Sequence, residues 1–328
     1  MTTNRTIDHR TVRSALALAA AAPSVHNSQP WRWLVGPHTV HLYADLSRWL
    51  PATDAVGRDM IVSCGAALHH MRVALAAAGL ASTVHRMPNA DEPDHLAAVA
   101  LHPRPAGAAD LALAAAIQHR RTDRRRFTGW EVPAGFVDEL VEHAAAQGAL
   151  LRPVTEARAR MRLTDAFQAA AEAQEANVAY LVERALWSGR IADVEGIPAS
   201  NLLRDAVASG GGTARRFSEG LLEQPSDDEP DGALLAVLAT ASDDPLSQLR
   251  AGEALSAVLL HATELGLATC PLSQPLEIGT SRRSVQDEVL DGTAAPQLVL
   301  RVGWAPPGPP LRQTPRRPID DMIEQLKV

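Results

Sequence analysis

Residues 21–33 read AAPSVHNSQPWRW, and they join a helix end, a polar loop and the start of a strand. The run 12–22 is rich in alanine and leucine, which favours a helix. Pro23 has no amide N–H and disfavours helical geometry for the residue before it, so we expect the helix to stop there. The apolar alternation over residues 31–35 predicts a strand.

The loop between this helix and this strand carries side chains that both donate and accept hydrogen bonds. Ser24, His26, Asn27 and Gln29 offer hydroxyl, imidazole and carboxamide groups. Such a loop can bind the edge of a heterocycle that itself alternates donors and acceptors. The alternative is a helix–loop–strand corner in which the polar residues serve only the turn.

A second motif, HRRTDRRRF at residues 119–127, surrounds a hydroxyl group with guanidinium groups. Arginine forms bidentate, charge-assisted hydrogen bonds and the hydroxyl adds a donor, so the motif suits a phosphate monoester. The alternative is a solvated basic turn. A nucleic-acid surface is disfavoured, because the chain has a net charge of −7 and no companion basic stripe.

The two motifs together resemble those of the FMN-dependent nitroreductases. The pattern A-P-S-x-x-N-x-Q-P-W is similar to the loop that contacts the flavin ring, and R-x-T-x-R is similar to the stretch that binds the FMN phosphate. The resemblance implies ring contacts from Pro23, Ser24, Val25, His26, Asn27 and Gln29. It implies phosphate contacts from Arg120, Thr122 and Arg124, with threonine where the family usually has serine.

Two segments near the C-terminus extend the resemblance. Residues 270–275 correspond to the family's loop along the flavin N5 edge, which implies a close approach by Leu272, Ser273 and Gln274. Residues 309–318 correspond to the family's basic tail, which returns to the phosphate. We expect Arg316 to bind the phosphate there, with Arg312 and Arg317 as rivals, and the alternative is an exposed proline-rich tail.

The order of the motifs and an internal similarity indicate a duplicated chain. In ordinary nitroreductases the phosphate motif precedes the ring loop, whereas here it follows it. A helical run from Gly65 ends in Gly79-Leu-Ala, and a similar run from Gly252 ends in Gly266-Leu-Ala, with the two glycines fourteen positions apart in both. A duplication explains the match economically. The chain is thereby similar to the Acg-like branch of the nitroreductases, whose members are two-repeat fusions.

The resemblance implies an α+β, nitroreductase-like fold that is duplicated within one chain. Half one would comprise residues 1–106 with the ring loop, and half two residues 107–328 with the phosphate motif. One FMN site would then need both halves, so a monomeric pseudo-dimer is favoured and a homodimer is possible. Residues 188–232, rich in Gly, Pro and acidic residues, are predicted to form a lid over the flavin; a disordered surface excursion is the alternative.

Composition excludes several other classes of protein. A chain of 328 residues with 46% hydrophobic and 21% charged residues suits two packed halves. Cys64 and Cys270 are predicted to be free thiols in a reducing compartment, so we expect a cytoplasmic location. Residues 5–22 resemble a signal peptide only superficially, because Asp8 interrupts the basic region. The histidines lack metal-ligand spacing, and no hydrolase motif occurs.

The resulting hypothesis is an FMN-dependent NAD(P)H oxidoreductase that passes electrons to a nitroaromatic or quinone-type acceptor. The cofactor carries such chemistry, so no side chain is assigned as catalytic. No dinucleotide fingerprint distinguishes NADH from NADPH. The alternative is a protein that stores, sequesters or senses FMN, with a lid that blocks turnover.

Overall fold

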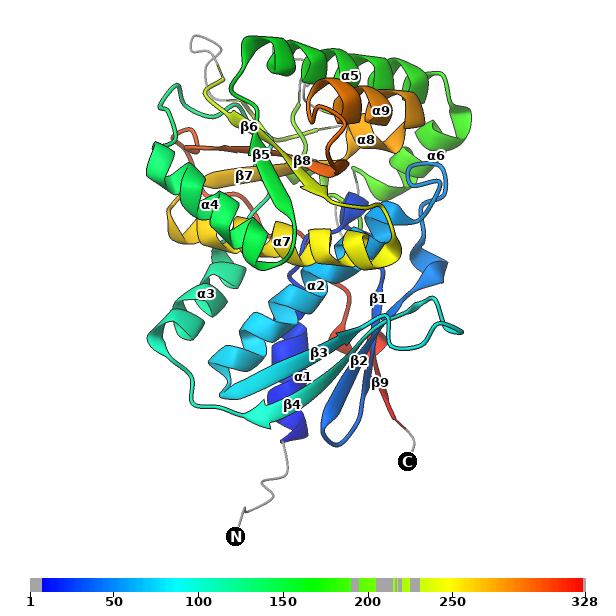
Figure 1. Cartoon of the computed structure of the whole chain (residues 1–328), viewed down its shortest axis with the longest axis vertical. Helices are drawn as coiled ribbons and strands as arrows, with labels where there is room; N and C mark the ends of the chain where they lie inside the picture. Colours follow the sequence, from blue (N-terminus) through cyan, green and yellow to red (C-terminus); the bar gives the residue numbers. More distant parts are fainter. Residues whose placement is uncertain are drawn as a thin grey trace.

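The computed structural model describes residues 8–189, 195–204, 215, 217, 220–224 and 231–326. Two β-sheets, each with its own helices, lie one above the other in Figure 1. The two longest helices, α2 (Arg58–Ala77) and α7 (Pro245–Glu264), pack against each other between the sheets. The core between the sheets is therefore built around one long helix that belongs with each sheet.

The first half of the chain forms a sheet with strand order β3-β4-β2-β1. Its elements, besides α2, are α1 (His9–Ala19), β1 (Trp31–Val35), β2 (Thr39–Ala44), β3 (Leu80–Arg86) and β4 (His95–Pro103). Neighbouring strands in this sheet are antiparallel. A C-terminal strand, β9 (Ile323–Gln325), then adds to β1 in parallel, so the end of the chain completes the sheet of its beginning.

The second half forms an antiparallel sheet with strand order β5-β6-β8-β7. Its strands are β5 (Leu150–Pro153), β6 (Leu234–Thr240), β7 (Ala268–Leu272) and β8 (Ala295–Gly303). Its helices, besides α7, are α3 (Ala108–His119), α4 (Ala134–Ala146), α5 (Ala157–Glu175), α6 (Val178–Trp187), α8 (Gln274–Glu277) and α9 (Gly279–Glu288). Apart from β9, in each sheet two strands precede the long helix and two follow it. The last of these four strands pairs with the second, the third pairs with the last, and the first lies on the other side of the second. The two sheets therefore share one strand order.

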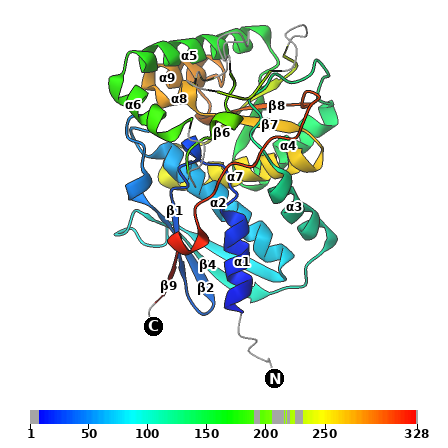
Figure 2. The ribbon, with the colours of Figure 1, turned by 180° about the vertical axis from the view of Figure 1, so that it is seen from behind.

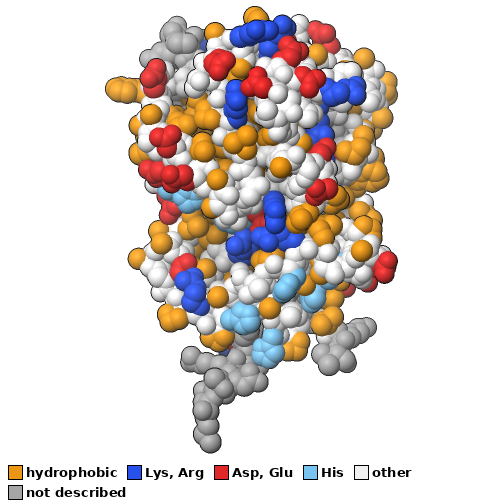
Figure 3. All heavy atoms as spheres, viewed as in Figure 1, with side chains coloured by type: hydrophobic (Ala, Val, Ile, Leu, Met, Phe, Trp, Pro, Cys, Tyr) orange, Lys and Arg blue, Asp and Glu red, His pale blue; other side chains and the backbone are white. Residues whose placement is uncertain are grey.

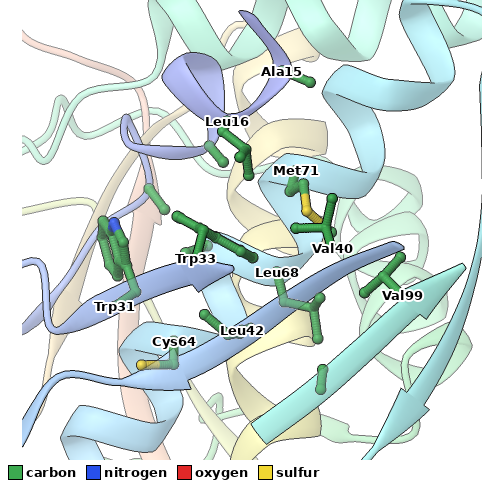
Figure 4. Packing of buried hydrophobic residues seen from close by; sticks show 14 of the residues in the cluster. Ala15, Leu16, Trp31, Trp33, Val40, Leu42, Cys64, Leu68, Met71 and Val99 are labelled. Carbon is green, nitrogen blue, oxygen red and sulfur yellow. The ribbon is translucent and has the colours of Figure 1, made fainter. Parts of the chain in front are cut away.

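The predicted strand at residues 31–35 is confirmed, and its alternation builds the core of the first half. Trp31 and Trp33 are fully buried, while Arg32 between them is only partly buried. Figure 4 shows the indole of Trp33 beside Leu42 of β2 and Leu68 of α2, with the indole of Trp31 further along the strand. Truncating a buried aromatic of this size to alanine costs about 3–5 kcal/mol, so these indoles fix how the strand packs beneath the helix.

One helix prediction needs correction. The first helix begins at His9, where Asp8 caps it, and ends at Ala19, three residues before the position expected from Pro23. The helical region after β5 is divided into two helices, α5 and α6. The break occurs because the Asn177 side chain accepts hydrogen bonds from the N–H groups of Ala179 and Tyr180, at 3.0 and 3.3 Å, which is the capping role that asparagine favours.

Other predictions agree with the structure. Gly79 and Gly266 follow the ends of α2 and α7 with φ of +83° and +77°, the left-handed conformation that glycine adopts after a helix. Cys64 and Cys270 are buried free thiols. Of the described helices, α2 alone is long and apolar enough to cross a membrane, and 78% of its most apolar window is buried, as in the core helix of a folded domain.

The C-terminal tail links the two sheets. Figure 2 shows it leaving β8, running along the back of the molecule past α7 and α2, and reaching β9 beside β1. On the opposite face, in Figure 3, acidic and basic side chains are intermixed over the second half, and histidines gather over the first sheet. The path of the tail is what carries its arginines to the loop between α1 and β1.

Candidate functional site

The loop after α1 has an unusual backbone. His26, Asn27 and Gln29 adopt positive φ angles of 46°, 57° and 51°. Non-glycine residues in this region cost about 1–3 kcal/mol each, and they cluster at functional sites. Two hydroxyl groups hold the loop: Ser63 of α2 accepts from the Val25 N–H at 3.1 Å, and Ser24 accepts from the Gln29 N–H at 3.0 Å.

One cavity, here called the inner cavity, lies between this loop, α2, α7 and the turn from β7 into α8. Residues that line it and that the sequence predicted are Pro23, Ser24, Val25, His26, Thr122, Arg124, Leu272, Ser273 and Gln274. The remaining lining residues are Asp59, Val62, Ser63, Ile197, Arg215, Phe217, Leu255, Pro271 and Leu298. Residues from both halves of the chain therefore enclose a partly apolar space.

A second cavity, here called the arginine cavity, adjoins the first and shares Pro23, Ser24, Thr122, Arg124 and Ile197 with it. Five arginines line it: Arg120, Arg121, Arg124, Arg312 and Arg316. No acidic residue is among its described lining residues. The two adjoining cavities therefore combine a strongly cationic end with a partly apolar end.

Arg120 and Arg316 lack a counter-charge among the described residues. Their Nη2 atoms donate to the same carbonyl oxygen, that of Ala21, at 3.2 and 3.1 Å. Arg120 Nε and Nη1 and Arg316 Nε are buried and make no hydrogen bond within the described part of the chain. Burial and neighbouring arginines lower the pKa of Arg120 to about 10 and that of Arg316 to about 9. Because arginine stays charged in proteins, this arrangement requires an anion.

The motif at residues 119–127 is docked onto β7 and is not a solvated turn. The Asp123 N–H donates to Thr269 O at 2.9 Å, and Arg120, Asp123 and Arg125 are at most 6% exposed. Asp123 accepts from Nε and Nη2 of Arg125, at 2.9 and 2.7 Å. Arg125 is thus neutralised by its neighbour, and the three residues predicted for the phosphate, Arg120, Thr122 and Arg124, face the cavities.

The tail arginines differ in where they lie. Arg316 lines the arginine cavity and donates to Asn27 Oδ1 at 3.0 Å. Arg312 lines the same cavity but is exposed. Arg317 points elsewhere, because it donates to the Gln29 carbonyl at 3.1 Å and pairs with Asp45 at 3.4 Å. The geometry therefore favours Arg316 among the three rivals.

Asn27 and Gln29 are placed differently from the expectation that they hold a ring edge. The Asn27 amide donates to the carbonyls of Gly196 and Pro315, at 2.8 and 3.0 Å. Gln29 is fully buried, lines neither cavity, and accepts the Arg317 N–H at 2.8 Å. Both carboxamides are used to fasten the tail to the loop, which leaves Ser24 and His26 as the loop's polar side chains at the inner cavity.

Several residues of the inner cavity were missed. Arg215 donates to the Tyr180 hydroxyl at 2.8 Å and pairs with the fully buried Glu277. Burial, this arginine and Arg124 lower the pKa of His26 well below its usual range, which favours the neutral form of the imidazole. Asp59 of the inner cavity was also missed, although the charged pair Arg58-Asp59 at the start of an apolar helix could have indicated it. No comparable feature of the sequence near Arg215 indicated that residue.

The predicted lid can be judged only in part. Ile197 lines both cavities, and Arg215 and Phe217 line the inner one. The glycine run at 210–212 and the acidic stretch at 225–230 lie outside the described residues. The described part of the segment 188–232 thus lies against the cavities, and its role as a lid stays a prediction.

Comparison with known proteins gives a consistent set of relatives, although no family model matches the chain. The protein named "Putative NAD(P)H nitroreductase Rv3131" of Mycobacterium tuberculosis is 45% identical over 320 residues, which is 97% of this chain and 92% of the relative. "Putative NAD(P)H nitroreductase acg" of the same species is 38% identical over 321 residues, 95% of each chain.

Solved nitroreductase structures are more distant. The FMN- and NADPH-dependent nitroreductase NfnB of a Sphingopyxis strain is 20% identical and covers 66% of this chain and 99% of its own, with a TM-score of 0.45. NfnB of Mycobacterium smegmatis, solved in complex with NADPH, is 19% identical over 66% of this chain and 98% of its own, with a TM-score of 0.43.

Proposed function

Because the chain belongs to the nitroreductase family, we propose that it is an FMN-dependent NAD(P)H oxidoreductase that passes electrons to a nitroaromatic or quinone-type acceptor. The observation that carries this proposal is the pair of buried guanidiniums, Arg120 and Arg316, with unpartnered nitrogens beside a partly apolar cavity. A phosphate monoester dianion supplies the missing charge, and the adjoining cavity suits an aromatic ring.

The residues present fit FMN. Arg120, Arg316 and Arg124 would bind the phosphate together with the Thr122 hydroxyl, because charge-assisted hydrogen bonds from arginine are the strong ones. The five residues shared by the two cavities would surround the ribityl chain. FMN, when bound, would supply hydride acceptance from the nicotinamide and electron donation to the acceptor.

The chain's own residues would orient the ring and exclude water from it. Ser24 and neutral His26 would face it from the loop, and Leu272, Ser273 and Gln274 from the turn after β7. Val62, Leu255 and Leu298 would supply apolar contact. Arg215, held by Tyr180 and Glu277, presents fixed guanidinium N–H donors at the cavity, where they would stabilise negative charge that develops on a reduced ring.

We infer further that the chain is an internal duplication, with halves that divide near residue 106. The shared strand order of the two sheets and the pairing of α2 with α7 support this. We therefore expect one FMN per chain, a monomer that needs no partner to complete its site, and, from the two free thiols, a cytoplasmic location.

The first test is the visible spectrum of the purified protein before and after anaerobic NADPH or NADH. We expect a flavin spectrum that bleaches with at least one of the two. Arg120→Ala should weaken FMN binding sharply, whereas Arg283→Ala, an exposed arginine of α9 in a similar run of basic residues, should not. A colourless protein that takes up no added FMN would overturn the proposal.

A second candidate function is storage or sequestration of FMN without turnover. It is favoured by Arg215 and Phe217, which belong to the predicted lid at residues 188–232 and line the inner cavity. If they cover the ring, neither nicotinamide nor acceptor can reach it. A flavin spectrum that persists after both NADPH and NADH would support this function over the first.

A further inference from the structure

Asp59, in the first turn of α2, carries a buried oxygen that nothing described in the structure binds. The residue is 3% exposed and lines the inner cavity. Its Oδ1 accepts from Arg58 Nε and Nη2, at 3.0 and 2.7 Å, while Oδ2 makes no hydrogen bond within the described residues. An unsatisfied buried carboxyl oxygen is costly, so its retention at a cavity wall points to a partner inside the cavity.

The surroundings of Asp59 favour a carboxyl group that can hold a proton. Burial raises the pKa of Asp59, the nearby carboxylate of Glu277 raises it further, and Arg58 and Arg215 oppose these effects. Asp54, just before α2, is a second buried carboxyl whose pKa Asp59 raises. With Oδ1 fixed by Arg58, a proton on Oδ2 would be free to bond with an occupant of the cavity.

The other titratable groups of the inner cavity cannot exchange a proton near neutral pH. Among the described lining residues these are His26, Arg124 and Arg215. Arginines do not release a proton in proteins. His26 Nε2 lies 3.3 Å from Arg215 Nη1, so it already accepts a hydrogen bond from a permanent cation. Asp59 is therefore the one group among them that can give up and regain a proton.

We propose that Asp59 is the proton donor of the inner cavity, which delivers the proton that accompanies the electron pair to the acceptor. This rests on the proposed oxidoreductase function. Reduction of a quinone adds one hydride, which originates from the nicotinamide, and one proton. The O–H bond at Asp59 Oδ2 breaks, a new O–H bond forms on the acceptor oxygen, and Asp59 becomes a carboxylate paired with Arg58. Solvent then returns its proton.

The test compares two oxidants of the reduced holoprotein in rapid mixing. A quinone must gain a proton, whereas ferricyanide takes only electrons and serves as the matched control. Asp59→Asn should slow oxidation by the quinone by about 100-fold, the usual size of a general-acid contribution, and leave oxidation by ferricyanide unchanged. In the wild-type protein the quinone rate should fall as the pH rises through the pKa of Asp59, and this fall should vanish in the variant.

Two further measurements guard against a variant that folds poorly, because Asp59→Asn leaves Arg58 buried without its counter-ion. Asp59→Glu keeps a carboxyl group that can pair with Arg58 when ionised and can donate a proton when protonated, so it should restore the quinone rate. Infrared titration of the wild-type apoprotein, which needs no flavin, should show a protonated carboxyl band that Asp59→Asn removes.

The outcomes separate this proposal from the proposed function. A protein that binds FMN and is bleached by NAD(P)H, but whose Asp59→Asn variant reduces the quinone as fast as wild type, overturns the role of Asp59 and leaves the oxidoreductase intact. Equal slowing with both oxidants also overturns it. A protein without flavin overturns the proposed function, and the infrared band then still tests whether Asp59 holds a proton.

Discussion

Gly65 of α2 and Gly252 of α7 meet where the two helices cross. A Cβ atom on Gly65 would lie 2.1 Å from the carbonyl oxygen of Leu249 and 2.9 Å from Gly252 Cα, and one on Gly252 would lie 2.0 Å from the carbonyl oxygen of Val62 and 2.7 Å from Gly65 Cα. The contact is reciprocal, since the spacing from Val62 to Leu249 equals that from Gly65 to Gly252. Such self-complementary contacts are typical of two-fold interfaces between identical subunits, which supports the proposed duplication.

Substituting either glycine should loosen this crossing. Gly65→Ala and Gly252→Ala place a methyl group against backbone that cannot rotate away, so each should lower the free energy of unfolding by about 3 kcal/mol. Urea denaturation measures this. Gly135→Ala in α4, where a Cβ meets nothing within 4 Å, is the matched control and should be neutral. Equal stability of all three variants would contradict the close approach.

Arg316→Ala should separate binding from stability. Loss of a charge-assisted contact of about 1.5–3 kcal/mol should weaken FMN binding by about 10- to 100-fold. The apoprotein should be at least as stable as wild type, because the substitution removes a largely buried charge without a counter-ion among the described residues. Flavin fluorescence titration and thermal unfolding of the apoprotein measure the two effects. An apoprotein that is clearly destabilised would show that Arg316 is structural.

Gln29→Ala should affect the tail and not the ring. The Gln29 side chain accepts the Arg317 N–H and lines neither cavity, so we expect a loss of about 1–3 kcal/mol from an unsatisfied buried group. Hydrogen exchange at the amides of Arg316 and Arg317 should accelerate. The shape of the flavin absorption spectrum should stay unchanged, and a shifted spectrum would mean that Gln29 reaches the ring after all.

Asp54 should make stability depend on pH. Burial and neighbouring Asp59 raise its pKa to about 7 in the folded state, against about 3.9 in the unfolded chain. The folded state therefore binds more protons between these values, and the free energy of unfolding falls as the pH rises from about 4 to about 7. Asp54→Asn should lose less stability between pH 5 and pH 8 than wild type, by about 1–3 kcal/mol. Urea denaturation at each pH measures the free energy of unfolding. An equal loss of stability in the two proteins between pH 5 and pH 8 would contradict the prediction.

The sequence determined the local structure and the chemistry of the two motifs. Alternation over residues 31–35 gave a strand because one face of a sheet is buried, and glycine after α2 and α7 gave left-handed helix ends because no other residue adopts them so readily. The charge and hydroxyl content of residues 119–127 indicated an anion site, since those groups act over a few residues.

Only the tertiary structure decided which polar groups were left without partners. Asn27 and Gln29 looked like ligands, yet the tail from residues 315–317 occupies them. Arg120 and Arg125 lie in one run of basic residues, yet Asp123 neutralises Arg125 and leaves Arg120 without a counter-charge among the described residues. Asp59 gained its role from packing against Arg58 and a cavity built by both halves. The physical reason is that a side chain's availability depends on every group that folding brings against it, and those groups come from distant parts of the chain.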